Sequence, residues 1–154
     1  MATNVNVPKS VTTNRPMHDG LVHGVIVACY RAEDQKWLVI RRSEHVPAPL
    51  VVCFPGGTRE IGETLHEAAL REAREEVGLE VRLVEQVWTF DFDDKPLRLF
   101  AFLAVATGGE VVVDPQEVAE AFWLSSQEIL DCPDVIENME SVLGAMMQAV
   151  EQLP

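Results

Sequence analysis

A cluster of glutamates at residues 72 to 76 is the part of the sequence best suited to chemistry. Glu75 and Glu76 stand three and four residues after Glu72. Each residue advances about 100° around an α-helix, so on a helix the carboxylates share an arc of roughly 100°. Like charges this close repel one another, and partial burial strengthens the repulsion. Mg²⁺ prefers oxygen ligands and would reverse that cost, so the cluster predicts a metal site.

The glutamates need a helix to position them, and residues 64 to 77 have the pattern of one. A stripe of apolar side chains recurs every four residues, at Leu65, Ala69, Ala73 and Val77. The stripe predicts a buried face with the acidic arc at its edge, and it leaves Glu67 and Arg74 on the solvated side. Gly78 then acts as a C-terminal stop signal.

Gly56 and Gly57 precede this helix and follow a short apolar stretch. Glycine permits positive φ and close backbone approach, so we expect a turn that brings a main-chain carbonyl or amide to a metal or phosphate. The sequence lacks the G-x-x-x-x-G-K-[ST] pattern of a nucleotide P-loop. Taken alone, a double glycine is typical of an ordinary turn and a glutamate run of a solvated helix face.

The joint spacing of these residues resembles the signature of the Nudix (MutT-like) hydrolase family, G-x5-E-x7-R-E-U-x-E-E-x-G-U, where U is bulky and apolar. The positions in register are Gly57, Glu63, Arg71, Glu72, Glu75, Glu76, Gly78 and Leu79. Ala73, at the first U, is smaller than the pattern asks, which affects packing and not chemistry.

This resemblance implies an α+β fold, a Nudix-like α/β/α sandwich with a central mixed β-sheet flanked by helices. It also implies a divalent cation, Mg²⁺ with Mn²⁺ as the alternative. The residues that would bind the cation are Glu72, Glu75, Glu76 and, through its carbonyl, Gly57. Supporting roles fall to Glu63 and to Arg71, which would orient carboxylates by ion pairing if a loop folds back onto the helix.

The resemblance leaves the general base open among two glutamates of the motif and one from a later loop. Glu75 and Glu76 are two candidates within the motif. Many family members draw another carboxylate from a loop after the sheet, where Glu117 and Glu120 are available. We favour Glu117, which falls in the loop proper, although an ordinary surface glutamate is an equal alternative for either residue.

Substrate contacts are only weakly indicated. The scarce basic residues that would meet distal phosphates include Arg41, Arg42 and Arg98. Phe90 is a candidate for stacking on a nucleobase. It alternates with Trp88 and Phe92, however, and that spacing is more typical of side chains filling one face of a strand.

Other elements follow from composition and periodicity. Strands are expected at residues 24–30 and 37–40, as a hairpin, and at 50–54, 81–92 and 97–106, with a short edge strand at 110–113. Helices are expected after Ser125 as far as residue 130, and over residues 135–151. Strands, a helix, more strands and further helices indicate a mixed sheet with helices packed against it.

The length of 154 residues suits one domain, predicted as residues 21–154 after a flexible leader of residues 1–20. The net charge of −13 argues against a nucleic-acid partner. No apolar run approaches the roughly 18 residues that span a bilayer, and no secretory signal is present, so we expect no membrane partner and a cytoplasmic location. A homodimer stays open.

The expected function is metal-dependent hydrolysis of a diphosphate linkage in a small nucleotide-like substrate, such as a nucleoside triphosphate or a nucleotide sugar. One alternative is a regulatory module that binds nucleotides without turnover, although such modules usually lack a metal-binding glutamate. Another is a diphosphate isomerase, for which Cys53 lies too close to the motif to match the expected cysteine.

Overall fold

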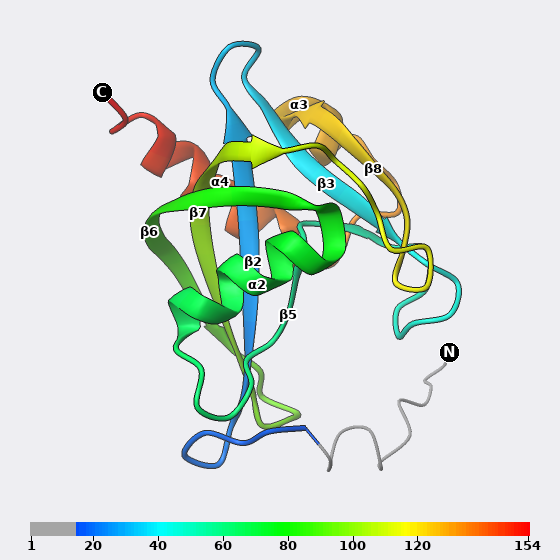
Figure 1. The fold of residues 1–154 in the computed structure, drawn as a ribbon, viewed down its shortest axis with the longest axis vertical. Helices are drawn as coiled ribbons and strands as arrows, with labels where there is room; N and C mark the ends of the chain where they lie inside the picture. The colour runs from blue at the N-terminus through cyan, green and yellow to red at the C-terminus, as the bar shows by residue number, and fades with distance from the viewer. Residues whose placement is uncertain (1–14) are drawn as a thin grey trace.

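The strands form one mixed sheet within residues 15–154, the part of the chain that the computed structural model describes (Figure 1). They are β2 (Val22–Arg31), β3 (Lys36–Arg42), β4 (Val52–Cys53), β5 (Gly56–Thr58), β6 (Leu79–Asp91), β7 (Leu97–Gly109) and β8 (Val118–Ser125). The order is β4-β3-β2-β7-β6, with β5 paired to β2 and β8 paired to β3. β2 and β7 run parallel, whereas the other pairs are antiparallel.

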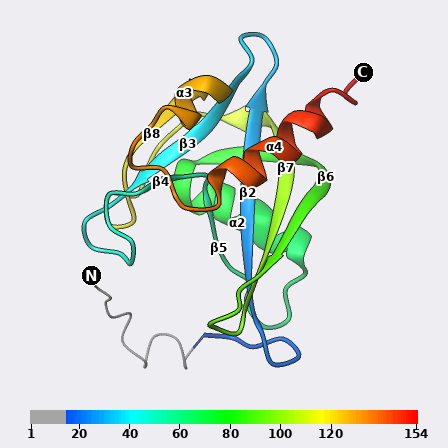
Figure 2. The same cartoon turned by 180° about the vertical axis from the view of Figure 1, so that it is seen from behind.

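Helices cover both faces of this sheet. α2 (Leu65–Val77) lies over one face (Figure 1), and α3 (Ser126–Leu130) and α4 (Met139–Val150) lie on the other (Figure 2). Alternate residues of β2 serve the two cores, because Val25 and Val27 pack on the side of α2 while Ala28 and Tyr30 pack on the side of α4. The predicted α+β sandwich is confirmed.

α2 forms where the sequence predicts a helix because local signals mark both of its ends. Thr64 caps the N-terminus, and its side chain accepts a hydrogen bond from the amide of Glu67, whose own side chain accepts from the amide of Thr64. Gly78 ends the helix in the left-handed conformation at φ 72°. Ala69 and Ala73 are fully buried on the face turned to the sheet.

The predicted turn at Gly56 and Gly57 is wrong, because both residues lie in β5 and pair with β2. Neither has positive φ. Gly56 is needed for close approach instead, since a Cβ atom there would lie 2.1 Å from the carbonyl oxygen of Val25. The double glycine therefore lets β5 run against β2 and under α2.

Two other predicted elements differ from the structure. Residues 110–113 form no strand, because the amide of Val112 donates to Val77 at the end of α2 and not to a neighbouring strand. The C-terminal helix begins at Met139 and not at Val135. The preceding residues run beside β4, where Ile136 donates to the carbonyl of Val52.

Most of the predicted leader, residues 1–14, lies outside the described residues. The described part of the leader, residues 15–20, packs against β2, because the rings of His18 and His23 stack with centroids 4.9 Å apart. No helix within residues 15–154 is long and apolar enough to cross a membrane.

Candidate metal and catalytic site

Glu72 and Glu76 are the two buried carboxylates of the described chain, with 8% and 5% of their surface exposed. Burial raises the pKa of Glu76 to about 7, although the amide of Gly56 opposes the shift by donating to Oε1 at 2.8 Å. Burial also raises the pKa of Glu72, against the opposing charge of Arg71. On the face of α2 next to β5, burial therefore makes the ionised forms of Glu72 and Glu76 less favourable than they would be in water.

Glu75, the third glutamate of the cluster, is much more exposed. Its side chain keeps 59% of its surface accessible, and its Oε1 lies 3.0 Å from Nη1 of Arg71. The carboxylates of Glu72 and Glu75 thus lie on one side of α2 and share Arg71 as a partner. Glu76 lies behind them, against β5.

Arg71 forms ion pairs with the carboxylates of Glu72 and Glu75 and also with Glu63. Its Nε donates to Glu63 at 2.7 Å and its Nη1 donates to Glu72 at 2.9 Å. Its Nη2 donates to the carbonyl of Thr58 at 2.9 Å and so ties α2 to β5. The guanidinium lowers the pKa of Glu63, chiefly by hydrogen bonding. Glu63 and Arg71 are eight residues apart, and the loop between β5 and α2 folds back to join them.

Gly57 allows the strand to lie directly under Glu72. A Cβ atom at Gly57 would stand 2.2 Å from Oε2 and 2.6 Å from Oε1 of that carboxylate, a separation that real atoms do not reach. A side chain at this position would displace Glu72. The motif glycine therefore keeps the space between strand and helix free.

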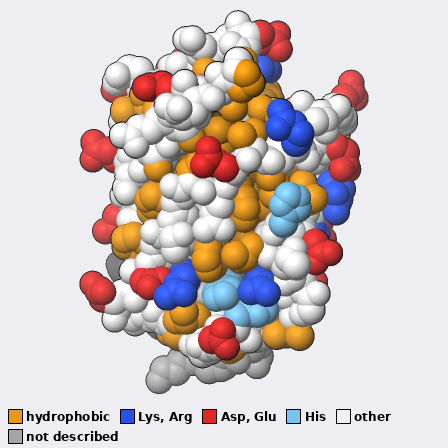
Figure 3. Space-filling view, turned by 90° about the vertical axis from the view of Figure 1, so that its left-hand side faces the viewer, with side chains coloured by type: hydrophobic (Ala, Val, Ile, Leu, Met, Phe, Trp, Pro, Cys, Tyr) orange, Lys and Arg blue, Asp and Glu red, His pale blue; other side chains and the backbone are white. Residues whose placement is uncertain are grey.

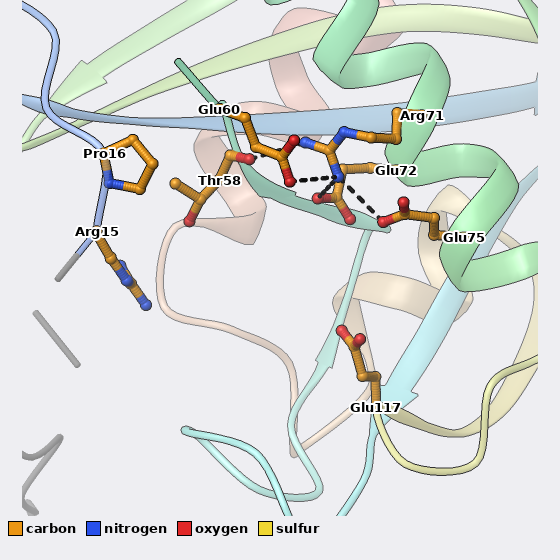
Figure 4. A pocket seen from close by; sticks show the side chains of 8 residues that line it. All are labelled: Arg15, Pro16, Thr58, Glu60, Arg71, Glu72, Glu75 and Glu117. Atoms are coloured by element: carbon orange, nitrogen blue, oxygen red, sulfur yellow. Dashed lines mark hydrogen bonds and ion pairs between the residues drawn. The ribbon is translucent and has the colours of Figure 1, made fainter. Parts of the chain in front are cut away.

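An open pocket of about 540 Å³ lies in front of these groups (Figure 4). The lining residues are Arg15, Pro16, Thr58, Glu60, Arg71, Glu72, Glu75 and Glu117. Four carboxylates and two guanidinium groups line it, so its wall carries a net negative charge. Figure 4 shows the carboxylate of Glu117 directed toward the side where Glu72 and Glu75 lie.

The two glutamates proposed from the later loop lie in different places. Glu117 lines the pocket and its charge raises the pKa of both Glu72 and Glu76. Glu120 lies within β8 and pairs with Arg41 at 3.5 Å, away from the pocket lining. The structure thus brings Glu117, and not Glu120, to the motif glutamates.

The predicted substrate-contact arginines are not among the lining residues. Arg41 also pairs with Asp134, at 3.2 Å, and Arg98 pairs with Asp91, at 2.5 Å. Arg42 donates to the carbonyl of Pro47 at 2.8 Å. Of the three, Arg42 has the clearest electrostatic link to the site, because its charge acts on Glu76.

Phe90 lies on the opposite face of the sheet from α2. Its ring stacks on Trp88 with centroids 5.6 Å apart, and Trp88 donates to Ser141 of α4 at 3.0 Å. Figure 3 shows hydrophobic side chains gathered on this β6 side of the molecule. The alternating aromatics therefore fill one face of β6, and Phe90 does not line the acidic pocket.

Sequence reasoning missed part of the pocket lining. Thr58 and Glu60 lie inside the motif interval, at positions where the signature accepts any residue. Arg15 carries no signal beyond being one of twelve basic residues in an acidic chain. The backbone path of residues 15–20 had to be known before Arg15 could be placed at the pocket.

Residues 15–154 contain no group of three histidine, cysteine or carboxylate side chains already arranged around a metal position. Arg71 lies between the carboxylates that would have to converge. The donor set nevertheless fits a hard cation, since it offers several carboxylates. Two of these, Glu72 and Glu76, are buried and have a raised pKa. Because Gly57 has no side chain, the space between its main chain and the carboxylate of Glu72 is not filled.

Residues 21–145 match the model of the NUDIX domain. The chain therefore belongs to the NUDIX domain family, and its assignment to the Nudix hydrolases is confirmed. An NAD-capped RNA hydrolase NudC from Escherichia coli is 34% identical over 99 residues, which cover 64% of this chain. The aligned part is 37% of that relative, so the chain matches little more than a third of its length.

Solved structures show the same fold. A NUDIX hydrolase from Nitrosomonas europaea superposes with a TM-score of 0.74 at 19% identity, covering 90% of this chain and 77% of the other. A UDP-X diphosphatase gives a TM-score of 0.71 at 19% identity, covering 93% and 69%. At these identities the likeness concerns the fold.

Proposed function

We propose that this chain is a Mg²⁺-dependent hydrolase that cleaves the diphosphate linkage of a nucleoside diphosphate joined to another group. The observation that carries the proposal is the acidic pocket in front of two buried glutamates with raised pKa. A diphosphate is itself anionic, so it would be repelled by this wall unless a divalent cation reversed the local sign.

The residues that would hold the cation are Glu72, Glu75, Glu76 and the carbonyl of Gly57. The cation would supply charge neutralisation at the phosphoryl group and a water of lowered pKa. Arg71 fixes Glu72 against β5 and keeps Glu63 in place. For the cation to enter, the bonds from Nη1 of Arg71 to Glu72 and Glu75 would have to give way, while those from its Nε and Nη2 to Glu63 and Thr58 could stay.

Three carboxylates could remove the proton from the attacking water: Glu75, Glu76 and Glu117. Glu117 faces the pocket from the opposite loop and makes no ion pair or side-chain hydrogen bond within the described residues, so its oxygens are available. Glu76 has a pKa of about 7, which suits proton exchange near neutral pH, but it is buried behind the lining. We therefore place the general base at Glu117.

The proposed substrate class rests on the chemistry that two similar proteins are named for, an NAD-capped RNA hydrolase and a UDP-X diphosphatase. NAD and a UDP-linked compound both contain a nucleoside diphosphate joined to a second group. The pocket volume of about 540 Å³ accommodates part of such a molecule, with the diphosphate near the carboxylates.

A substrate panel tests this proposal. The protein is incubated with Mg²⁺ or Mn²⁺ and nucleoside triphosphates, NAD, ADP-ribose, nucleotide sugars and dinucleotide polyphosphates, and the phosphate-bearing products are measured. Wild type should release a nucleoside monophosphate from at least one substrate. Glu76→Gln should lower kcat by about 100-fold or more, because it removes a carboxylate that would hold the cation.

The matched control is Glu85→Gln, which changes an exposed glutamate of β6 that is not among the residues lining the pocket. This control should keep wild-type kcat. Absence of product from every substrate would support a nucleotide-binding module instead, and full activity of Glu76→Gln would contradict the proposed site.

A further inference from the structure

Ser43 is a buried polar residue that the proposed reaction does not use. Only 3% of its surface is exposed, and apart from Glu72 and Glu76 it is the one buried polar side chain of the described chain. Its hydroxyl donates to the carbonyl of Gln116 at 2.7 Å and accepts from the amide of His45 at 3.1 Å. Its own amide donates to the carbonyl of Glu117 at 3.0 Å.

These bonds continue the pairing of β3 with β8 past an irregularity. Arg41 pairs with Glu120, but Arg42 pairs with Val118, so Ala119 is an extra residue on β8. Such a bulge shifts the alternation of side chains by one position. Val118 is consequently buried in the core beneath α2, and the next residue back along the chain, Glu117, emerges at the pocket.

The other side of the same loop is closed by Asp114. Its carbonyl accepts from the amides of Glu117 at 3.0 Å and Val118 at 2.8 Å. Its carboxylate accepts from the amide of Gln116 at 3.0 Å. Asp114 shapes the turn internally, whereas Ser43 is the contact that ties this turn to β3.

We propose that Ser43 is a positioning residue that holds Glu117 at the acidic pocket. This inference rests on the proposed function, in which Glu117 acts on water. Residues 114–116 are exposed, so apart from the bonds within the turn and the main-chain bond from the amide of Ser43 to Glu117, the hydroxyl of Ser43 is the side-chain contact that fixes this segment. Without the hydroxyl, the carbonyl of Gln116 and the amide of His45 lose their partner, and the loop gains freedom to move Glu117.

A double-mutant cycle separates positioning from a general loss of stability. Ser43→Ala should lower kcat roughly tenfold or more with little change in KM, because misplacement of a catalytic group acts on the chemical step. In the Glu117→Gln background the same substitution should change kcat by less than about twofold, because the group it positions is already disabled.

The matched control is Ser126→Ala. Ser126 also has a hydroxyl bonded to a buried partner, since Nε1 of Trp37 donates to it at 3.0 Å, but it lies in α3. Ser126→Ala should lower the thermal midpoint while leaving kcat unchanged. Equal losses of kcat in the two serine variants, or additive losses in the cycle, would show a structural role only and overturn the inference.

A readout without substrate keeps the two proposals distinguishable. Amide exchange at residue 43 and at Val118 should accelerate in metal-free Ser43→Ala and stay unchanged in Ser126→Ala. Unchanged exchange in Ser43→Ala overturns the positioning role whatever the activity. Accelerated exchange in a protein that hydrolyses no diphosphate would support the anchor and refute the proposed function.

Discussion

Glu76 has the most strongly perturbed environment among the motif glutamates. Burial is the main cause, and the charges of Glu72 and Glu117 add to it. The amide of Gly56 compensates only in part. The folded chain therefore holds a proton on Glu76 at pH values where an unfolded glutamate has released it.

Replacing Glu76 by glutamine should change how stability depends on pH. The pKa of Glu76 rises from 4.5 in the unfolded chain to about 7 in the fold. When folding raises the pKa of a group, that group stabilises the fold fully at pH values below its pKa in the unfolded chain. For Glu76 this contribution is lost as the pH rises to about 7, its pKa in the fold. In the absence of metal, the free energy of unfolding of Glu76→Gln minus that of wild type should therefore increase between pH 5 and pH 8. The increase should be on the order of 3 kcal/mol.

The measurement is urea unfolding of both proteins at the two pH values with a chelator present. Glu85→Gln, at an exposed position, should differ from wild type equally at both. A Glu76→Gln difference that does not change with pH would contradict the burial argument.

Gly57→Ala should damage the proposed metal site more than the fold. The added Cβ would meet the carboxylate of Glu72 at 2.2 Å, so that carboxylate must move. We expect a loss of about 1–3 kcal/mol in stability and a clear fall in Mg²⁺ affinity, measured by urea unfolding and calorimetric titration.

Gly62→Ala is the matched control for this variant. Gly62 has φ 82° and open space around it, so alanine costs about 1 kcal/mol through backbone strain alone. Its Mg²⁺ affinity should stay at the wild-type value. Retained affinity in Gly57→Ala would count against a cation next to Glu72.

At the residue scale, the motif predicted partners that are distant along the chain. It paired Glu63 with Arg71 and placed Gly57 beside the glutamates, because a fixed spacing on one helix and one loop determines those distances. It could not predict Glu60 or Arg15, since their place at the pocket depends on loop paths that no periodicity encodes.

At the scale of elements, the predictions were most accurate where local signals act alone. α2 and α3 both begin with a capping box that is visible in the sequence. The strand predicted at residues 110–113 was wrong because β-branched composition does not supply a pairing partner. The early start predicted for α4 was wrong because residues 134–136 bond to β4 instead.

The helix α4 contains a glycine that the fold does not require. Gly144 is exposed, has no positive φ, and a Cβ there would meet no atom within 4 Å. Gly144→Ala should therefore raise the free energy of unfolding by about 0.5–1 kcal/mol, because alanine restricts the unfolded chain and favours the helix. Urea unfolding checks this value, and a destabilised variant would mean that α4 packs more closely there than described.

At the scale of the whole molecule, the charge of −13 favours small substrates over polymeric ones, although the relatives from Escherichia coli are named as NAD-capped RNA hydrolases, so the absence of a nucleic-acid partner stays a prediction. The average field repels a phosphate backbone even if a cation attracts one diphosphate locally. The sequence supplied this constraint directly, whereas the location of the negative pocket required the fold. The cytoplasmic location and a homodimer stay predictions.

A nucleotide that carries an RNA tail should therefore be a poorer substrate than the same nucleotide alone. At low salt, kcat/KM should fall as the tail lengthens, and the difference should shrink at high salt because screening weakens the repulsion. Steady-state kinetics with a dinucleotide and its RNA-linked forms would measure this. A preference for the longer substrate would contradict the prediction.

Arg71 also bears on how the protein matures. Many small metalloproteins cannot fold until their ion arrives, because their ligands repel one another in its absence. Here a guanidinium from the same helix already lies among the carboxylates. The polypeptide should therefore reach its native shape in a magnesium-poor medium and load the ion afterwards, so that supply of the ion governs activity without governing abundance.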